Sequence, residues 1–276
     1  MATTWLITAA SRGLGRALAQ TALDDGDVVV AASRSGDASL RATAGSLHTV
    51  TLDVAEPGAA DDAVKEALAL VGHPDIVVNN AGQGLLGAIE ETSDEEVAEV
   101  LNTNLVGPLR VARAVLRHLR TRRSGRIVNV SSIAALDPLA GSGVYAAAKA
   151  GLSALSDALA EEVEPLGVQV MAVEPGAFRT EFLSAQSIRR TTRSIEDYAT
   201  TSGAVLDRLD SHAGRQPGDP ARAARVIVDA TRSATPPRHL VLGDDALRRT
   251  RKSAARLLTD LDTWQARSLA TAFSDH

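Results

Sequence analysis

Residues 4–15 read TWLITAASRGLG, an apolar run followed by a turn with two glycines and the start of a segment of helical periodicity. The run Trp5–Thr8 is mostly apolar without alternation, as is typical of a strand buried on both faces of a parallel sheet. Glycines at a strand-to-helix turn let backbone N–H groups approach a pyrophosphate, whose charge the helix dipole favours. A glycine pair alone is equally compatible with a plain tight turn. Its place after the first strand of a β-α-β unit favours phosphate binding.

Strand-like runs and helical segments alternate along the rest of the chain. The strand-like runs are Trp5–Thr8, Val28–Ala32, Leu47–Leu52, Ile76–Asn79, Arg126–Val130, Val168–Val173 and His239–Leu242. Helical periodicity lies between them, over residues 13–25, 59–71, 94–101, 105–123, 145–165 and 219–232. This β-α-β-α succession predicts an α/β fold, a Rossmann-type doubly wound parallel sheet of about seven strands with helices on both faces.

The chain is predicted to form one catalytic domain over residues 1–243, with a helical extension of that domain over 244–276. Residues 177–218 interrupt the last β-α crossover with polar, arginine-rich sequence. An irregular insertion of that length in a compact domain usually serves as a lid or binding loop, and we name it the lid insertion. Its arginines between 179 and 193 are expected to face solvent, with closure over a nucleotide or an anionic substrate as the alternative.

Composition excludes several function classes. The 276-residue chain has 45% hydrophobic and 23% charged residues, as ordinary globular proteins have. Its net charge of −5 creates no positive field for nucleic acid, and no apolar run approaches the ~18 residues that span a membrane. With no cysteine and six scattered histidines, we expect no metal site. The first residues, Met1-Ala2-Thr3-Thr4-Trp5, contain no basic residue, so we expect no secretory signal. The expected compartment is the cytoplasm.

Two arginines occupy positions at which the adenosine ribose of a dinucleotide is expected. The second strand ends Ala31-Ala32-Ser33-Arg34. In dinucleotide folds an acid at this position selects the 2′-OH, and an arginine accommodates the 2′-phosphate. Arg12 in the glycine turn could converge on the same phosphate. Because charge-assisted hydrogen bonds are worth roughly 1.5–3 kcal/mol each, the pair predicts NADP(H), the alternative being that both arginines are simply exposed.

Two further strand ends are predicted to meet the same ligand. Asp53 follows the third strand and could accept a hydrogen bond from the adenine amino group. Asn80, Ala81 and Gly82 follow the fourth strand, where small residues let the chain pass close to a ribose. Each of these features alone is also typical of an ordinary turn after a strand.

A second group of side chains follows the fifth strand. Ser132 stands at its carboxyl end, where open α/β sheets place ligands. Tyr145 and Lys149 are four residues apart on the next predicted helix and therefore share a face. An ordinary tyrosine, with a pKa of about 10, is a poor acid–base catalyst near neutral pH. The neighbouring ammonium, aided by an oxidised nicotinamide, is expected to lower that pKa, which predicts Tyr145 as the proton-handling residue.

Together these motifs resemble those of the short-chain dehydrogenase/reductase family in its single-domain form. The resemblance runs from about residue 4 to residue 242, and its motifs are the glycine turn, Asp53-Val54, Asn79–Gly82, Asn104, Ser132, Tyr145, Lys149 and Pro175-Gly176. The stretch VEPGAFRT at 173–180 and the long C-terminal tail are most similar to the hydroxysteroid-dehydrogenase-like group. The sugar-nucleotide-modifying branch fits less well, because its turn has the pattern Gly-x-x-Gly-x-x-Gly.

The resemblance implies a catalytic tetrad of Asn104, Ser132, Tyr145 and Lys149. Tyr145 would be the acid in reduction and the base in oxidation, and Ser132 would orient the carbonyl. Lys149 would bind the nicotinamide ribose, and Asn104 would hold a water that links Lys149 to solvent. The implied cofactor contacts, of which Pro175, Gly176 and Thr180 border the nicotinamide, are Ser11, Arg12, Gly13, Leu14, Arg34, Asp53, Val54, Asn80, Ala81, Gly82, Tyr145, Lys149, Pro175, Gly176 and Thr180.

One position departs from the family pattern, because Ala9 stands where the family's turn has a glycine. Its Cβ could crowd the cofactor or strain a backbone angle that glycine adopts freely. Since Gly13 and Gly15 are kept, we expect weaker cofactor binding at most.

These features predict an NADP(H)-dependent oxidoreductase that transfers a hydride between nicotinamide and a carbonyl or secondary alcohol. The alternatives are an NAD(P)+-dependent alcohol dehydrogenase acting oxidatively and a non-catalytic NADP(H) sensor. The resemblance also implies a homodimer or homotetramer formed through residues 105–123 and 145–165. A medium-sized, largely apolar carbonyl substrate is expected from its predicted neighbours, Leu85, Leu86, Leu136, Val144, Phe178, Phe182 and Tyr198.

Overall fold

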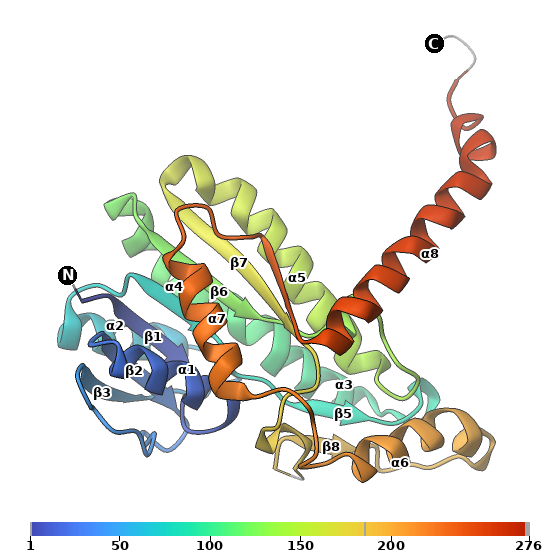
Figure 1. Ribbon diagram of the computed structural model, residues 1–276, viewed down its shortest axis with the longest axis horizontal. Helices are drawn as coiled ribbons and strands as arrows, with labels where there is room; N and C mark the ends of the chain where they lie inside the picture. The colour runs from blue at the N-terminus through green and yellow to red at the C-terminus, as the bar shows by residue number, and fades with distance from the viewer. Residues whose placement is uncertain (1, 185, 274–276) are drawn as a thin grey trace.

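The computed structural model describes residues 2–184 and 186–273 (Figure 1). Residues 1, 185 and 274–276, which the predicted domain ranges include, lie outside this description. A seven-stranded parallel sheet has the order β3-β2-β1-β4-β6-β7-β9. Its strands are β1 Thr4–Thr8, β2 Val28–Ser33, β3 Ser46–Thr51, β4 Ile76–Asn79, β6 Gly125–Val130, β7 Val168–Pro175 and β9 His239–Leu242. The predicted α/β fold class and its doubly wound sheet are confirmed.

Helices cover both faces of this sheet (Figure 1). On one face lie α1 Gly13–Asp24 and α7 Pro220–Arg232, which pack against each other. On the other face lie α2 Ala59–Val71, α4 Gly107–Arg122 and α5 Gly143–Val163. The order of the strands reverses between β1 and β4, and ligands of such sheets bind beyond the carboxyl ends of the strands at that reversal.

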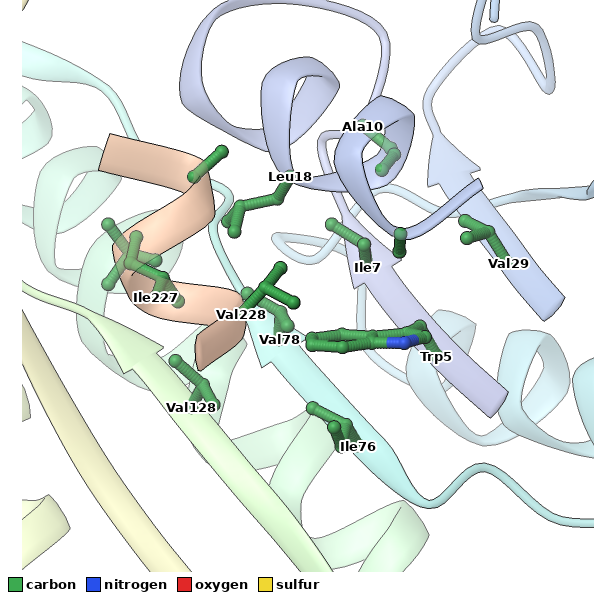
Figure 2. Close-up of a cluster of buried hydrophobic side chains, with 14 of the residues drawn as sticks. Trp5, Ile7, Ala10, Leu18, Val29, Ile76, Val78, Val128, Ile227 and Val228 are labelled. Atoms are coloured by element: carbon green, nitrogen blue, oxygen red, sulfur yellow. The ribbon is translucent and has the colours of Figure 1, made fainter. Parts of the chain in front are cut away.

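The central strands lack alternation because both of their faces are buried. Along β1, Trp5 and Ile7 belong to the hydrophobic cluster beneath α1 and α7, whereas Leu6 belongs to the cluster on the opposite face. Figure 2 shows the Trp5 indole lying over the sheet near Ile76 and Val228. Its Nε1 donates to Asp27 at 2.8 Å, so the polar edge of this buried ring is satisfied.

The two helices predicted over residues 94–101 and 105–123 form one continuous helical segment. Helix α3, Asp94–Leu101, runs through a π-helical turn, Asn102–Val106, directly into α4. A π turn inserts one extra residue into a helix and often marks a functional position. Here the turn contains Asn104, whose side chain is completely buried.

The lid insertion is more ordered than its sequence indicated. It contains the short strand β8, Ile188–Arg190, and the helix α6, Ala204–Ser211. Strand β8 pairs in parallel with β5, Gly84–Leu86, as a separate two-stranded sheet. The sequence analysis identified neither strand, because three residues are too few to show a period. The lid arginines Arg189 and Arg190 form surface ion pairs with Glu99 and Asp210.

The predicted C-terminal helical segment is one long helix, α8, Asp244–Leu269. It starts directly after β9 and extends away from the sheet (Figure 1). Across residues 2–184 and 186–273, no helix combines the length and apolar character needed to cross a membrane. In the same residues, no cluster of three or more histidine, aspartate or glutamate side chains could hold a metal ion.

Candidate active site

A cavity of about 300 Å³ lies at the carboxyl ends of β1, β4, β6 and β7. This volume is at the lower end of the usual range for small-molecule sites. The structure brings most of the predicted site residues together in its lining, namely Arg12, Gly13, Leu14, Asn80, Gly82, Ser132, Tyr145, Lys149, Pro175, Gly176 and Thr180. Of the described residues, the lining does not include Ser11, Arg34, Asp53, Val54, Ala81 or Asn104.

The glycine turn brings the start of α1 against the end of β4. A Cβ added to Gly15 would lie 2.2 Å from Nδ2 of Asn80 and 2.6 Å from the carbonyl oxygen of Ala9, so no larger residue fits there. Asn80 Nδ2 donates to the carbonyl oxygens of Thr8, at 3.1 Å, and Ala9, at 3.2 Å. The Thr8 hydroxyl in turn accepts from the backbone N–H groups of Asn80 and Ala81. These bonds hold the two central strand ends together.

The first turn of α1 is suited to an anion. Gly13 and Leu14 line the cavity, and the N-cap residue Arg12 makes no side-chain cap within the described chain. The first turn of the helix also carries no acidic residue. Its N–H groups and the helix dipole therefore fit the phosphates of a dinucleotide.

Ala9 does adopt the backbone conformation that its position in the family pattern suggested. Its φ is +51°, in the left-handed region that glycine enters without a steric penalty and alanine does not. The residue also lines the cavity. The departure at Ala9 therefore introduces backbone strain at the glycine turn.

Of the residues predicted to meet the adenosine, Arg34, Asp53 and Val54 lie just after β2 and β3, outside the cavity lining, whereas Arg12 lines the cavity. Arg34 is exposed immediately after β2. Asp53 accepts from the backbone N–H of Ala55 at 3.0 Å, and Val54 beside it is buried. Arg12 is half-buried and makes only long hydrogen bonds, of 3.4 and 3.5 Å, to Gln186. These positions leave the two guanidinium groups accessible to a phosphate.

The chemical end of the cavity combines Ser132, Tyr145 and Lys149. Ser132 follows β6, and its Oγ accepts from the N–H of Ala134 at 3.1 Å. Tyr145 lies in the first turn of α5 with its ring 5.8 Å from that of Phe182. Lys149 is one turn further along the same helix, 3% exposed, and its Nζ donates to the carbonyl oxygen of Val130 at 2.7 Å. The predicted i, i+4 arrangement therefore places both side chains on the cavity.

The pKa values at this end differ from the sequence-based expectation. Burial raises the pKa of Tyr145 to about 12, and its hydrogen bond with Ser132 acts in the opposite direction. Burial also lowers the pKa of Lys149 to about 8. The protein's own residues therefore do not make the phenol more acidic, because loss of solvation outweighs the hydrogen bond with Ser132. Tyr145 is protonated at neutral pH and can act as a proton donor.

Asn104 lies behind Lys149 and not on the cavity wall. Its Oδ1 accepts from the N–H of Gln83 at 2.8 Å, and its Nδ2 donates to the carbonyl oxygen of Gln83 at 2.7 Å. A Cβ added to Gly82 would lie 3.2 Å from Asn104 Oδ1 and 3.3 Å from Lys149 Nζ. Gly82 therefore permits the close approach of the loop after β4 to both side chains.

A buried polar network fixes α5 to the sheet behind the site. Ser131 Oγ donates to the carbonyl oxygen of Lys149 at 2.8 Å. Ser153 Oγ lies within hydrogen-bond distance of Ser131 Oγ, at 2.9 Å, and of Glu174 Oε1, at 3.2 Å. His239 Nδ1 reaches the same Glu174 oxygen at 2.8 Å. The backbone that carries Lys149 is thus connected through side chains to β7 and β9.

Several cavity walls come from residues that the sequence did not indicate. Of its expected substrate neighbours, Phe178 and Phe182 line the cavity, whereas Leu85, Leu86, Leu136, Val144 and Tyr198 are outside the described lining. Leu85 instead packs in a separate core with Val100 and Ala148. The remaining walls come from the lid insertion and from the start of α8, through Glu181, Leu183, Leu209, Gln216, Asp245 and Arg249.

One signal could have identified the α8 residues, because this helix follows a strand whose carboxyl end faces the crevice. Asp245 accepts from the backbone N–H of Ala177 at 3.0 Å, and Arg249 Nε donates to Asp137 at 3.0 Å. No comparable signal marks Gln216, which is 4% exposed. Its Oε1 has no hydrogen-bond partner among the described residues, although the side chain lines the cavity.

Comparison with known proteins identifies relatives over the whole chain. The short chain dehydrogenase family model matches residues 3–191. An oxidoreductase of Botryotinia fuckeliana is 33% identical over 272 residues, which cover 97% of this chain and 98% of that protein. The 3-ketodihydrosphingosine reductase of Bacteroides thetaiotaomicron is 36% identical over 194 residues, or 70% of this chain and 71% of that protein. The crystal structure of a short-chain dehydrogenase from Streptomyces avermitilis superposes with a TM-score of 0.90 at 35% identity, covering 98% of each chain.

Proposed function

This chain belongs to the short-chain dehydrogenase family of nicotinamide-dependent oxidoreductases, and from that premise we propose that it is an NADP(H)-dependent reductase of a largely apolar carbonyl compound. The observation that carries the proposal is the common cavity of Ser132, Tyr145, Lys149 and the N-terminal turn of α1. Such a cavity joins an anion site to a proton donor across the carboxyl edge of the sheet. A bound NADPH would supply the hydride.

Each catalytic side chain has a role that its surroundings support. Tyr145 donates the proton to the carbonyl oxygen, since its raised pKa keeps the phenol protonated at neutral pH. Ser132 donates a hydrogen bond to the same oxygen and holds it beside the phenol. The ammonium of Lys149 is held by its hydrogen bond to the carbonyl oxygen of Val130. From there it stabilises the phenolate of Tyr145 that remains after proton transfer. Asn104 holds the loop at Gln83, and its proposed role is to hold a water that links Lys149 to solvent.

Preference for the reductive direction rests on this protonation state. An oxidative enzyme needs a phenolate as base, which a pKa of about 12 disfavours near neutral pH. The relative from B. thetaiotaomicron is also named as a reductase of a keto compound. The non-catalytic sensor is disfavoured because a protein that only binds NADP(H) has no use for a phenol that exchanges a proton beside Ser132.

We propose NADP(H) and not NAD(H) as the cofactor because of the charged side chains expected near the adenosine ribose. Arg34 follows β2, and no acidic side chain occupies that position to bind a ribose 2′-OH. Arg12 is close to the glycine turn and only weakly engaged by Gln186. A 2′-phosphate would replace these long contacts with charge-assisted hydrogen bonds. Asp53 and Val54 would then border the adenine.

The proposed substrate is a medium-sized, mostly apolar aldehyde or ketone. Phe178, Phe182, Leu183 and Leu209 supply apolar walls beside Tyr145. Gln216 adds one unpaired amide oxygen, which suits a hydrogen-bond donor on the substrate away from the reacting carbonyl. Arg249 is already engaged by Asp137, so it does not provide a free cation for an anionic substrate.

We further propose a cytoplasmic homo-oligomer made of single-domain subunits. The absence of cysteine from the sequence suits a reducing compartment. In the subunit, residues 1–243 form the catalytic domain and 244–276 its helical extension, with the lid insertion covering the cavity. The family-type interface would use the outer surfaces of α4 and α5.

A substrate panel tests the proposal. Oxidation of NADPH is followed with medium-sized apolar ketones and aldehydes and, for comparison, with small charged keto acids. We expect turnover of the apolar compounds and a clear preference for NADPH over NADH. Binding of NADPH without turnover of any carbonyl or alcohol would favour the sensor, and exclusive turnover of the charged acids would contradict the proposed substrate class.

A further inference from the structure

The far half of α8 carries an apolar stripe that the rest of the chain leaves uncovered. The near half is attached to the body, because Ala246 is buried and Ser253 Oγ donates to the carbonyl oxygen of Leu136 at 2.8 Å. From residue 254 to residue 273 every described residue is exposed. Figure 1 shows this half of the helix projecting clear of the sheet and its helices.

The exposed apolar residues follow the spacing of a helix-pairing surface. Leu257, Leu261 and Trp264 are separated by four and three residues and are 61%, 58% and 54% exposed. Residues at this spacing form one stripe along a helix, and two such stripes pack together in coiled-coil pairs. Ala254 extends the stripe, and Leu258, also 61% exposed, flanks it. Contiguous exposed apolar surface of this kind marks an interaction site.

The charges beside the stripe are complementary to those of a second copy. Asp260 and Arg267 are seven residues apart and lie on the same flank of the stripe. The Arg267 guanidinium already lies over the Trp264 ring, 4.8 Å from its centroid. In an antiparallel pair that sets Leu261 against the partner's Trp264, Asp260 meets the partner's Arg267. The twofold axis between the two helices generates a second, identical ion pair, between Arg267 and the partner's Asp260.

We propose that residues 254–269 of α8 form an antiparallel helix pair with the same segment of a second copy of this chain. In this register the partner's Leu269 lies opposite Arg256, which is 65% exposed and makes the last contact of α8 with its own body, a long ion pair of 3.8 Å to Asp137. A shift of one heptad towards the body would place the partner's Leu269 opposite Arg249, which is packed against Asp137. That shift would also bring Asp260 close to the partner's Asp260, where the two negative charges repel. Steric fit and charge therefore both favour the first register.

The charge balance favours a protein partner over a lipid surface. Segment 254–269 holds two arginines, Arg256 and Arg267, and two aspartates, Asp260 and Asp262, so its net charge is zero. Helices that lie on anionic membranes combine their apolar face with an excess of lysine and arginine. In α8 the basic excess lies in residues 248–256, largely before the apolar stripe begins.

The helix pair is distinct from the family-type interface proposed for α4 and α5. A pair of this length buries less than the roughly 800 Å² per partner of a standard interface, so we expect a dissociation constant in the micromolar range. Loss of the pair should therefore remove only the assembly step that depends on α8 and leave any contacts of α4 and α5 in place.

Charge reversal in the full chain tests the pairing, with mass measured by light scattering from about 1 to 200 μM. Asp260→Arg and Arg267→Asp each set like charges against each other, and each should raise the concentration needed for assembly about tenfold. The double variant should recover the wild-type value. An equimolar mixture of the two single variants should also recover it, because the mixed pair has opposite charges at both contacts.

Asp262→Arg serves as the matched control, since it makes the same charge change on the side of the helix away from the stripe. It should leave the mass curve unchanged. Trp264 fluorescence should shift to shorter wavelength as the wild type assembles, while the completely buried Trp5 provides a constant background. Equal effects of Asp260→Arg and Asp262→Arg, or no recovery in both the double variant and the mixture, would overturn the proposal. A Trp264 shift that occurs only with phosphatidylserine vesicles would overturn it in favour of membrane binding.

Discussion

At the chemical end of the crevice Lys149 and Asn104 are held firmly, whereas at the end predicted to meet the adenosine the two arginines are held loosely. Lys149 is buried and bonded to Val130, and the carbonyl oxygen of its own residue accepts from Ser131. Asn104 uses both of its amide atoms on Gln83. Arg34, by contrast, is exposed, and Arg12 makes only hydrogen bonds of 3.4 and 3.5 Å.

This difference in how firmly the side chains are held predicts different effects of substitutions at the two ends. Groups that move a proton must be held in one position, because misplacement of a reacting group costs rate steeply. Groups that recognise a phosphate can reach it from solvent, since a guanidinium remains charged in any orientation. Substitutions at the chemical end should therefore change the rate, and those at the adenosine end should change which nucleotide binds. The following predictions test that separation.

The largest effect is expected for Tyr145→Phe. The substitution keeps the ring that packs near Phe182 but removes the proton donor, so kcat should fall by about 10³–10⁴. The affinity for NADPH, measured by quenching of protein fluorescence, should change less than about threefold. Phe182→Leu removes the neighbouring ring and keeps the phenol, so it controls for packing. A Tyr145→Phe variant that binds NADPH and retains full turnover would contradict the proposed mechanism.

A pH profile should sharpen the assignment of Lys149. Its pKa is lowered to about 8, so the ammonium is present below that pH and is lost above it. The phenol of Tyr145, with its pKa raised to about 12, stays protonated over the same range. In the reductive direction kcat/KM should therefore fall as the pH rises through about 8, by up to tenfold per pH unit. A rate that remains level to pH 10 would rule out a role for the ammonium.

Arg34→Asp should have a smaller effect, confined to cofactor choice. Loss of one charge-assisted contact is worth roughly 1.5–3 kcal/mol, which weakens NADPH binding about 10- to 100-fold, whereas NADH binding should be kept or improved because an acid there can bind the ribose 2′-OH. The melting temperature should stay the same, since the side chain is exposed. Arg222→Asp is the matched control, because that side chain is 90% exposed and lies on α7. An unchanged preference for NADPH in Arg34→Asp would refute the cofactor assignment.

The smallest effect is expected for Ala9→Gly. Glycine relieves the strain of a φ of +51° but adds freedom to the unfolded chain, which leaves a net gain of about 0.5–1 kcal/mol in the free energy of unfolding. The melting temperature should rise by about 1–4 °C for a chain of this size. Ala114→Gly within α4 should shift the melting temperature downward, because glycine is unfavourable inside a helix. A fall in the melting temperature of Ala9→Gly would show that the strain is absent.

Local patterns predicted most of the fold. The strands around Trp5, Val29 and Val77 could be predicted from the sequence, because a strand that is buried on both faces needs uninterrupted apolar residues. The β5–β8 pair was missed because it joins three-residue segments about a hundred positions apart, whose pairing depends on the packing of Gly84 against Ile188. The π turn at Asn104 was missed for a similar reason, since Asn104 is bonded to Gln83 in the loop between β4 and β5.

The sequence alone determined the sheet, the glycine turn and the spacing that sets Tyr145 one turn before Lys149. These features depend on residues that are close in sequence, so a local period or motif is enough to predict them. Only the tertiary structure decided that burial raises the Tyr145 pKa, that Arg249 and Gln216 reach the cavity, and that the far half of α8 leaves the body. Solvation and long-range contact depend on which distant segments come to lie side by side, and no local pattern specifies that.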